Sequence, residues 1–107
     1  MKTVVKRRPF GNTGLLVSEV SLGAMNLRML KTRQEAVEMV NYVLDQGINL
    51  IDTAWAYTGT NGSGEFIASE EIIGEVLESR KDIDEPIVII TKNHGYTPEV
   101  FDEEFAV

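Results

Sequence analysis

The sequence has no cysteine and only one histidine. The missing thiols exclude disulfides and thiolate metal sites within these 107 residues, and we expect no metal site of another kind. No apolar run approaches the ~20 residues that cross a bilayer. The basic start has no apolar segment after it, so we expect no secretory signal. Together these absences favour a cytoplasmic protein without a membrane segment.

Basic residues are also scarce, with 10 against 17 acids and a net charge of −7. A chain of this charge is repelled by phosphate backbones, so we expect no nucleic-acid partner. The one basic cluster, Lys6 to Arg8, stands beside a proline and is interpreted as a solvated strand edge rather than a polyanion site. Its hydrophobic content of 43% is ordinary for a globular chain, and the length suits one modest domain.

The first half of the chain predicts a hairpin, a strand and a helix. Two short extended runs flank the turn sequence GNTG at residues 11–14, where glycines allow positive φ. The next strand ends at Gly23. A helix is expected to begin at Thr32, with Glu35 completing a capping box, and to end at Gly47.

The second half continues the alternation of strands and helices. We expect a strand at 48–52, a glycine-rich loop at 58–66, a helix capped by Ser69, a strand at 87–92 and a further helix beginning at Thr97. This order predicts parallel βαβ units, and the apolar strands predict a sheet covered on both faces. The expected apolar helix faces are Ala36, Val37, Val40, Val43 and Leu44, and then Ile72, Ile73, Val76 and Leu77.

Three parallel strands do not make a finished domain, because both edges of their sheet would be open. We therefore expect residues 1–107 to be the N-terminal part of a larger α/β structure. Both a barrel and an open doubly wound sheet fit this pattern.

Chemically active residues stand where the predicted strands end, the place where sites gather in α/β folds. The second strand ends in Asp52 and the third in Lys92. Neighbouring strands lie about 4.8 Å apart, so the two charges would form an ion pair in a dry rim. Tyr57 adds a phenol, and a lysine cation beside a phenol favours the phenolate and so eases proton transfer to a carbonyl oxygen. The pattern predicts that Asp52 positions Lys92 and that Lys92 activates Tyr57.

Each of these residues taken alone also has a structural interpretation. Asp52 can cap a turn, Lys92 can be a surface lysine, and Tyr57 can be a packing residue. Met25 and Met29 are interpreted as packing residues rather than cofactor contacts. The presence of the acid, the phenol and the amine in one chain favours the catalytic interpretation.

Four segments together resemble the N-terminal third of an aldo-keto reductase. They are FGNTGLLVSEVSLGAMN, GINLIDTAWAY, SEEIIGEVL and IVIITK, and their order is more specific than any one of them. The resemblance implies a (β/α)₈ TIM barrel with an N-terminal β-hairpin closing its bottom, truncated here after about three strands. It also implies NAD(P)H-dependent reduction of a small aldehyde or ketone to an alcohol, with NADPH the usual cofactor and NADH the alternative.

The resemblance also assigns roles to single residues. Asp52, Tyr57 and Lys92 match three members of the family's catalytic tetrad, with Tyr57 as the proton donor. The cofactor-binding positions that it assigns are Gly23, Ala24, Met25 and Asp52.

Some of the family's pattern is missing or altered. The resemblance places the catalytic histidine and the residues that hold the cofactor's adenosine phosphate beyond Val107. His94 stands too close to Lys92 to be that histidine, and we interpret it as a loop residue, with pocket lining as the alternative. Trp55 is interpreted as pocket wall or as rim packing. The loop after Tyr57 is longer than the family's link, which bears on the placement of the phenol and on the shape of a substrate pocket.

Two functions are therefore weighed. The first is a nicotinamide-dependent carbonyl reductase. The second is a non-catalytic barrel fragment, or a binding or regulatory subunit of the same fold. We expect the 107 residues alone to be inactive, because an unclosed barrel cannot hold a dinucleotide.

Overall fold

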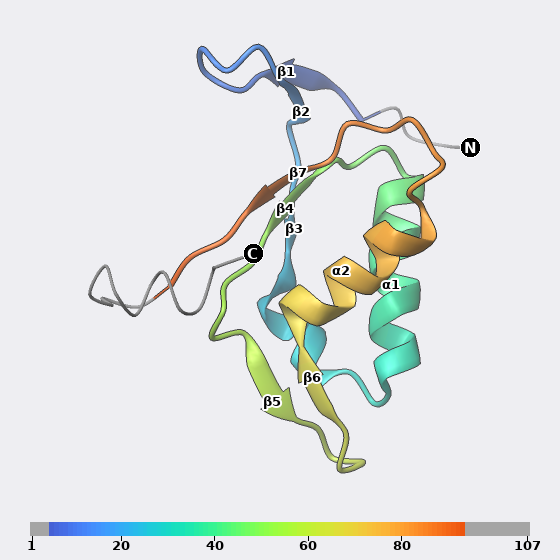
Figure 1. Cartoon of the computed structure of the whole chain (residues 1–107). Helices are drawn as coiled ribbons and strands as arrows, with labels where there is room; N and C mark the ends of the chain where they lie inside the picture. The colour runs from blue at the N-terminus through green and yellow to red at the C-terminus, as the bar shows by residue number, and fades with distance from the viewer. Residues whose placement is uncertain (1–4, 94–107) are drawn as a thin grey trace.

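The computed structural model describes residues 5–93 (Figure 1). A helix expected from Thr97 lies outside these residues. The elements within them are β1 (Arg7–Pro9), β2 (Leu16–Ser18), β3 (Leu22–Gly23), the 3₁₀ helix η1 (Ala24–Met29), α1 (Arg33–Asp45), β4 (Leu50–Asp52), β5 (Thr58–Thr60), β6 (Phe66–Ala68), α2 (Ser69–Ser79) and β7 (Val88–Ile90).

The central element is a parallel sheet of three strands in the order β3-β4-β7. Ile51 of β4 lies opposite Leu22 of β3 and Ile89 of β7. The connections pass through α1 and α2, and Figure 1 shows both helices on the same side of the sheet. The predicted parallel βαβ units are confirmed.

The helix α1 begins and ends as its sequence predicts. The backbone N–H of Glu35 donates to the Thr32 hydroxyl at 3.1 Å, and Gly47 follows the helix with a φ of 93°. Only the reciprocal bond of the capping box differs, because the Glu35 carboxylate accepts from the backbone N–H of Lys31. The carboxylate still serves a backbone donor at the helix start, one residue earlier than expected.

The predicted cap of α2 is wrong. Ala68 is the residue before the helix, and Ser69 is its first residue. The buried Ser69 hydroxyl donates instead to the backbone carbonyl of Ala24 at 2.6 Å. A buried carbonyl without a donor costs about 1–3 kcal/mol, so this long-range bond takes precedence over a local cap that water can replace.

The core lies between the helices and the sheet. Its buried side chains include Ile51 of β4 and Ile67 of β6, and the predicted apolar helix faces supply much of the rest. The buried core residues are Ala24, Leu27, Ala36, Val40, Leu44, Ile51, Ile67, Ile72, Ile73 and Val76.

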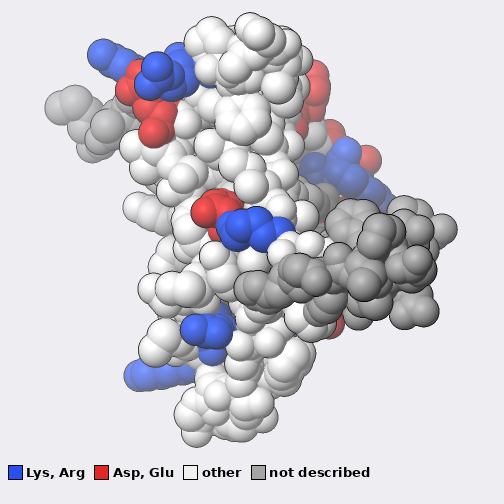
Figure 2. Space-filling view, turned by 90° about the vertical axis from the view of Figure 1, so that its left-hand side faces the viewer, with Lys and Arg blue, Asp and Glu red and all other residues white. Residues whose placement is uncertain are grey.

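The expectation that the sheet is covered on both faces is wrong for residues 5–93. Leu50 and Val88 on the face opposite the helices are only half-buried, and Ile90 is 36% exposed. No described helix packs on this face, because α1 and α2 both lie on the other. Figure 2 looks onto the open side, whose described surface carries few charged side chains.

Two antiparallel hairpins lie at opposite ends of the sheet (Figure 1). The predicted N-terminal hairpin is β1 with β2. The segment 58–66, expected to be a loop, instead forms most of the hairpin of β5 and β6. Its turn is closed by the Asn61 side chain, which accepts from the backbone N–H groups of Ser63 and Glu65, and Gly64 adopts a φ of 83°. Glycine and polar residues are typical of turns and rare in strands, so the two short strands could not be predicted from the sequence.

Asn49 joins three segments at the start of the sheet, and sequence reasoning missed this function. Its side-chain oxygen accepts from the backbone N–H of Ser18 at 2.7 Å. Its amide nitrogen donates to the carbonyl of Leu16 at 2.9 Å and to that of Pro86 at 2.8 Å. This buried amide therefore connects β2, β4 and the segment that leads into β7.

Candidate active site

Asp52 is the last residue of β4, the middle strand of the sheet. It lies opposite Gly23 of β3 and Ile90 of β7. This register places its carboxylate at the carboxyl edge of the sheet. The side chain belongs to the open face rather than to the core, because Ile51 before it points to the helices and is fully buried.

Lys92 reaches this edge from the segment after β7. Its backbone carbonyl accepts from the N–H of Trp55 at 3.0 Å, and the carbonyl of Ile90 accepts from the N–H of Thr53 at 2.8 Å. These bonds continue the pairing past the end of both strands. The backbone beyond β7 is therefore held beside the turn that follows Asp52.

The Lys92 ammonium donates a hydrogen bond to the Asp52 carboxylate. This bond raises the pKa of Lys92 above its ordinary value of 10.5, against a smaller opposing effect of desolvation, and Tyr57 adds to the rise. The ammonium is therefore charged at neutral pH. The expected dry rim is wrong for the described residues: both side chains are 46% exposed, because no described element covers the open face.

The phenol ring of Tyr57 is the second group close to the Lys92 ammonium. The Lys92 nitrogen is 5.3 Å from the centre of the phenol ring, within the range of a cation–π contact. The Tyr57 backbone is held at both groups: its N–H donates to the Ala54 carbonyl at 3.1 Å, and its carbonyl accepts from Ser69 at 2.9 Å. The long segment after Tyr57 does not loosen its position, since that segment is a paired hairpin.

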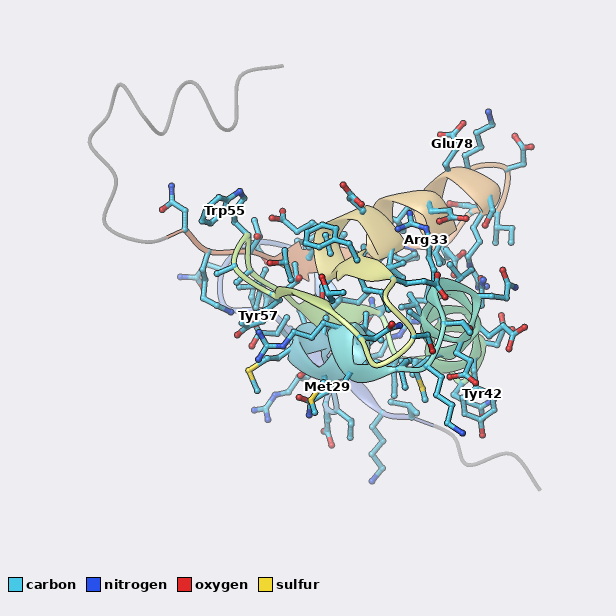
Figure 3. All side chains as sticks on the ribbon, turned by 90° about the horizontal axis from the view of Figure 1, so that it is seen from below. Met29, Arg33, Tyr42, Trp55, Tyr57 and Glu78 are labelled. Atoms are coloured by element: carbon cyan, nitrogen blue, oxygen red, sulfur yellow. The ribbon has the colours of Figure 1, made fainter. Side chains whose placement is uncertain are left out.

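Exposed apolar side chains lie on the same side of the molecule as Tyr57. Figure 3 shows Trp55, Tyr57 and Met29 at one side of the molecule, away from Tyr42. Met29 is 72% exposed and Met25 is 44% exposed, so neither packs into the core of residues 5–93, contrary to the expectation for packing residues. The 3₁₀ helix explains this, because its three-residue repeat buries one side only, where Ala24 and Leu27 lie. Trp55 is 41% exposed and lies at the rim.

The predicted cofactor positions fall into two environments. Gly23 is exposed, and a Cβ atom built on it would meet nothing within 4 Å, so the space beside Asp52 is open. Met25 also faces solvent. Ala24, in contrast, is fully buried, and its carbonyl is taken by Ser69.

Two hollows flank the hairpin of β5 and β6, and sequence reasoning found neither. The arginine hollow has a volume of about 400 Å³ and is lined by Arg28, Met29 and residues 58–62. The acidic hollow, of about 450 Å³, includes Trp55, Glu70 and Glu71 in its lining. If a hairpin had been predicted for residues 58–66, a hollow on each of its flanks could have been expected.

A metal cluster and a membrane-spanning helix are both absent from the described part of the chain. Residues 5–93 contain no group of three or more metal-ligating side chains. None of their helices is long and apolar enough to cross a membrane. His94 lies outside the described residues. The structure thus brings Asp52, Lys92 and Tyr57 together as one charged and phenolic group at the sheet edge.

Comparison with known proteins supports one family. A 6-dehydroglucose reductase from Novosphingobium aromaticivorans is 34% identical over 97 residues, which are 90% of this chain and 32% of that protein. The aldo-keto reductase AMT2 of Alternaria alternata is 34% identical over 91 residues, 79% of this chain and 23% of that one. The solved aldo-keto reductase AKR11C1 from Bacillus halodurans, in its holo form, superposes with a TM-score of 0.64 at 28% identity. That match covers 89% of this chain and 28% of the other.

The chain thus spans about a quarter to a third of the length of these relatives. The family model for the aldo/keto reductase family matches residues 19–105, which include β3, β4, β7 and the charged group at their ends. The parallel sheet carries an acid, an amine and a phenol at its carboxyl edge. Because the family model also matches most of the sequence, the chain belongs to the aldo/keto reductase family.

Proposed function

We propose that the protein containing this chain reduces small aldehydes or ketones to alcohols with NADPH or NADH, and that Tyr57 donates the proton. The observation that carries the proposal is the position of the Lys92 ammonium, which binds the Asp52 carboxylate and lies 5.3 Å from the Tyr57 ring. A positive charge at that place stabilises negative charge developing on a phenol that gives up its proton. The family's relatives support oxidoreductase chemistry.

The residues at the sheet edge fit a nicotinamide cofactor. Asp52 offers a half-exposed carboxylate, a suitable acceptor for ribose hydroxyl groups, and Gly23 beside it leaves open space. Met25 adds an exposed apolar side chain. We propose that these three residues hold the nicotinamide end. When bound, the cofactor supplies a hydride, that is, a proton with two electrons.

The chain's own residues then supply one proton and stabilise the negative charge that its loss leaves on the phenol. The hydride goes to the carbonyl carbon, and the Tyr57 hydroxyl gives its proton to the carbonyl oxygen, so the carbonyl becomes an alcohol. Lys92 stabilises the phenolate that remains until solvent returns a proton. Asp52 keeps Lys92 charged and in position, because breaking their hydrogen bond would leave the ammonium free to turn into solvent.

We further propose that residues 1–107 form part of a (β/α)₈ barrel and do not catalyse by themselves. The open face of the three-stranded sheet carries Leu50, Val88 and Ile90, apolar side chains that the interior of a barrel would cover. The half-exposed Asp52 and Lys92 lie on the same rim and would become drier in a closed barrel. The attraction between the two charges would then be stronger, because the local dielectric constant would be lower.

The test is the reduction of simple aldehydes by the whole natural polypeptide, followed as NADPH oxidation. Removing a general acid costs 10²–10⁴-fold, so Tyr57→Phe is expected to lower kcat/KM by roughly that factor. Tyr42→Phe is the matched control, because Tyr42 is exposed on α1 and should leave the rate unchanged. Full activity of Tyr57→Phe would contradict the proposed role, and loss in Tyr42→Phe would make the effect unspecific.

A further inference from the structure

Among residues 5–93, one charged side chain lines the arginine hollow, that of Arg28. Its other lining residues are Met29 and the hairpin residues 58–62, which are polar or apolar but uncharged. A small-molecule site commonly has this character, with a few polar groups and one charge in a hollow of a few hundred cubic ångströms.

Arg28 is held in place rather than extended into solvent. Its guanidinium donates to the Thr58 carbonyl at 3.3 Å. Its aliphatic stem lies over Gly59, where a Cβ atom would come within 3.4 Å of the Arg28 Cδ. A glycine at this position leaves room for the stem, and the stem together with the hydrogen bond restricts the direction of the guanidinium.

The guanidinium has no acidic partner among residues 5–93. Two other arginines of the chain do have partners there: Arg33 pairs with Glu75, and Arg80 with Glu85. A guanidinium carries five N–H donors in a planar fork that matches a carboxylate, and Thr58 takes one of them. In a chain with a net charge of −7, an arginine that lines a hollow without an acid is suited to an external anion.

The hollow is connected to the proposed reaction site through the backbone, because its lining begins at the residue after Tyr57. Thr58, whose carbonyl binds Arg28, directly follows Tyr57. The wall is fixed as well, because the Asn61 amide donates to the carbonyls of Leu30 and Lys31, both at 2.9 Å. Both the guanidinium and the wall of the hollow are therefore held by hydrogen bonds, one residue along the backbone from Tyr57.

We propose that Arg28 binds an anionic group, a carboxylate or a phosphate, carried by the carbonyl substrate, and so selects negatively charged aldehydes or ketones. This inference rests on the reductase function proposed above. The acidic hollow on the other flank of the hairpin supports one orientation, since Glu70 and Glu71 repel an anion there. The charged end of the substrate is directed to Arg28.

The experiment compares matched aldehydes with the whole natural polypeptide and NADPH. The series 4-oxobutanoate, 5-oxopentanoate and 6-oxohexanoate is set against butanal, pentanal and hexanal, and phosphate-bearing aldehydes extend it to the second anion. The wild type is expected to prefer the charged member of at least one pair. Arg28→Met should lower kcat/KM roughly 10- to 100-fold for that charged aldehyde, the effect of losing hydrogen bonds to a charged group, and should spare its uncharged partner.

Controls separate the subsite from bulk charge and from misfolding. Arg8→Met removes the same charge from the exposed strand β1 and should leave the preference unchanged. Arg28→Lys keeps the charge and most of the stem but lacks the planar fork, so it should retain part of the preference. Calorimetric binding of pentanoate, which cannot be reduced, gives a readout independent of turnover and should be weakened by Arg28→Met.

The outcomes are distinguishable. Reduction of both members of every pair at similar rates, or equal pentanoate binding by wild type and Arg28→Met, would overturn the anion subsite and leave the reductase function standing. A polypeptide that reduces no aldehyde overturns the reductase function and the substrate role of Arg28 with it. A charge preference lost in Arg28→Met and kept in Arg8→Met supports the inference.

Discussion

Replacing Asn49 with leucine should destabilise the fold more than any other single substitution considered for this chain. Leucine has nearly the same size but no polar atoms. Asn49 is 3% exposed, and its side chain makes three hydrogen bonds of 2.7 to 2.9 Å to the backbone of two other segments. The substitution therefore removes polar contacts without opening a large cavity.

The magnitude follows from the environment of each partner. The buried backbone N–H of Ser18 would be left without an acceptor, which costs about 1–3 kcal/mol. The carbonyls of Leu16 and Pro86 are only partly buried and can find water, so each bond is worth about 1 kcal/mol. The expected loss is about 3–5 kcal/mol, a large fraction of the 5–15 kcal/mol that ordinarily stabilises a folded protein.

Urea unfolding of the whole natural polypeptide, followed by circular dichroism, measures this loss. The midpoint should fall while the slope stays unchanged, because the same surface is exposed on unfolding. Asn12→Ala, in the exposed turn of the first hairpin, is the control and should change stability by less than about 0.5 kcal/mol.

A second variant tests the geometry. Asn49→Asp keeps the acceptor for Ser18 but faces the carbonyls of Leu16 and Pro86 with a carboxylate, so it should be more destabilising at pH 7 than at pH 4, each relative to wild type. A loss below about 1 kcal/mol for Asn49→Leu would refute the reasoning, since three buried or partly buried bonds cannot then depend on this side chain.

Two further predictions concern Ser69 and Lys92. Ser69→Ala should cost about 1–2 kcal/mol in urea unfolding, because it leaves the Ala24 carbonyl without its buried donor; Ser21→Ala, at an exposed position, should be neutral, and equal effects would contradict the assigned bond. At neutral and alkaline pH, the raised pKa of Lys92 means that its bond to Asp52 stabilises the fold fully up to about pH 10.5 and is lost as the pH rises through the folded-state value. Between about pH 6 and 12, wild type should therefore lose stability relative to Lys92→Met only above about pH 10.5, and a difference that changes between pH 6 and 9 would exclude this cause.

The local elements could be predicted from the sequence because they depend on neighbours a few residues apart. The cap of α1 by Thr32 and its glycine end involve contacts within one turn of helix. The strand ends at Asp52 and near Lys92 could be located as well, since an apolar run stops at each charge. With adjacent parallel strands, the meeting of these two charges then follows from the sheet geometry.

Only the tertiary structure decided contacts between residues far apart in the chain. Serine is a common capping residue, but the Ser69 hydroxyl donates instead to the carbonyl of Ala24, 45 positions away. The amide of Asn49 binds the backbone of two other segments, and no local pattern marks it. The half-exposure of the Asp52–Lys92 pair likewise depends on which elements cover the open face of the sheet.

The sequence by itself therefore determined the βαβ order, the amphipathic helices and the chemical character of the sheet edge, because propensity, capping and periodicity act over short distances. The tertiary structure alone decided the hairpin of β5 and β6, the hollow that holds Arg28, and the bond made by Ser69. These depend on packing and on the pairing of buried polar groups, whose partners are chosen by the folded backbone rather than by position along the chain.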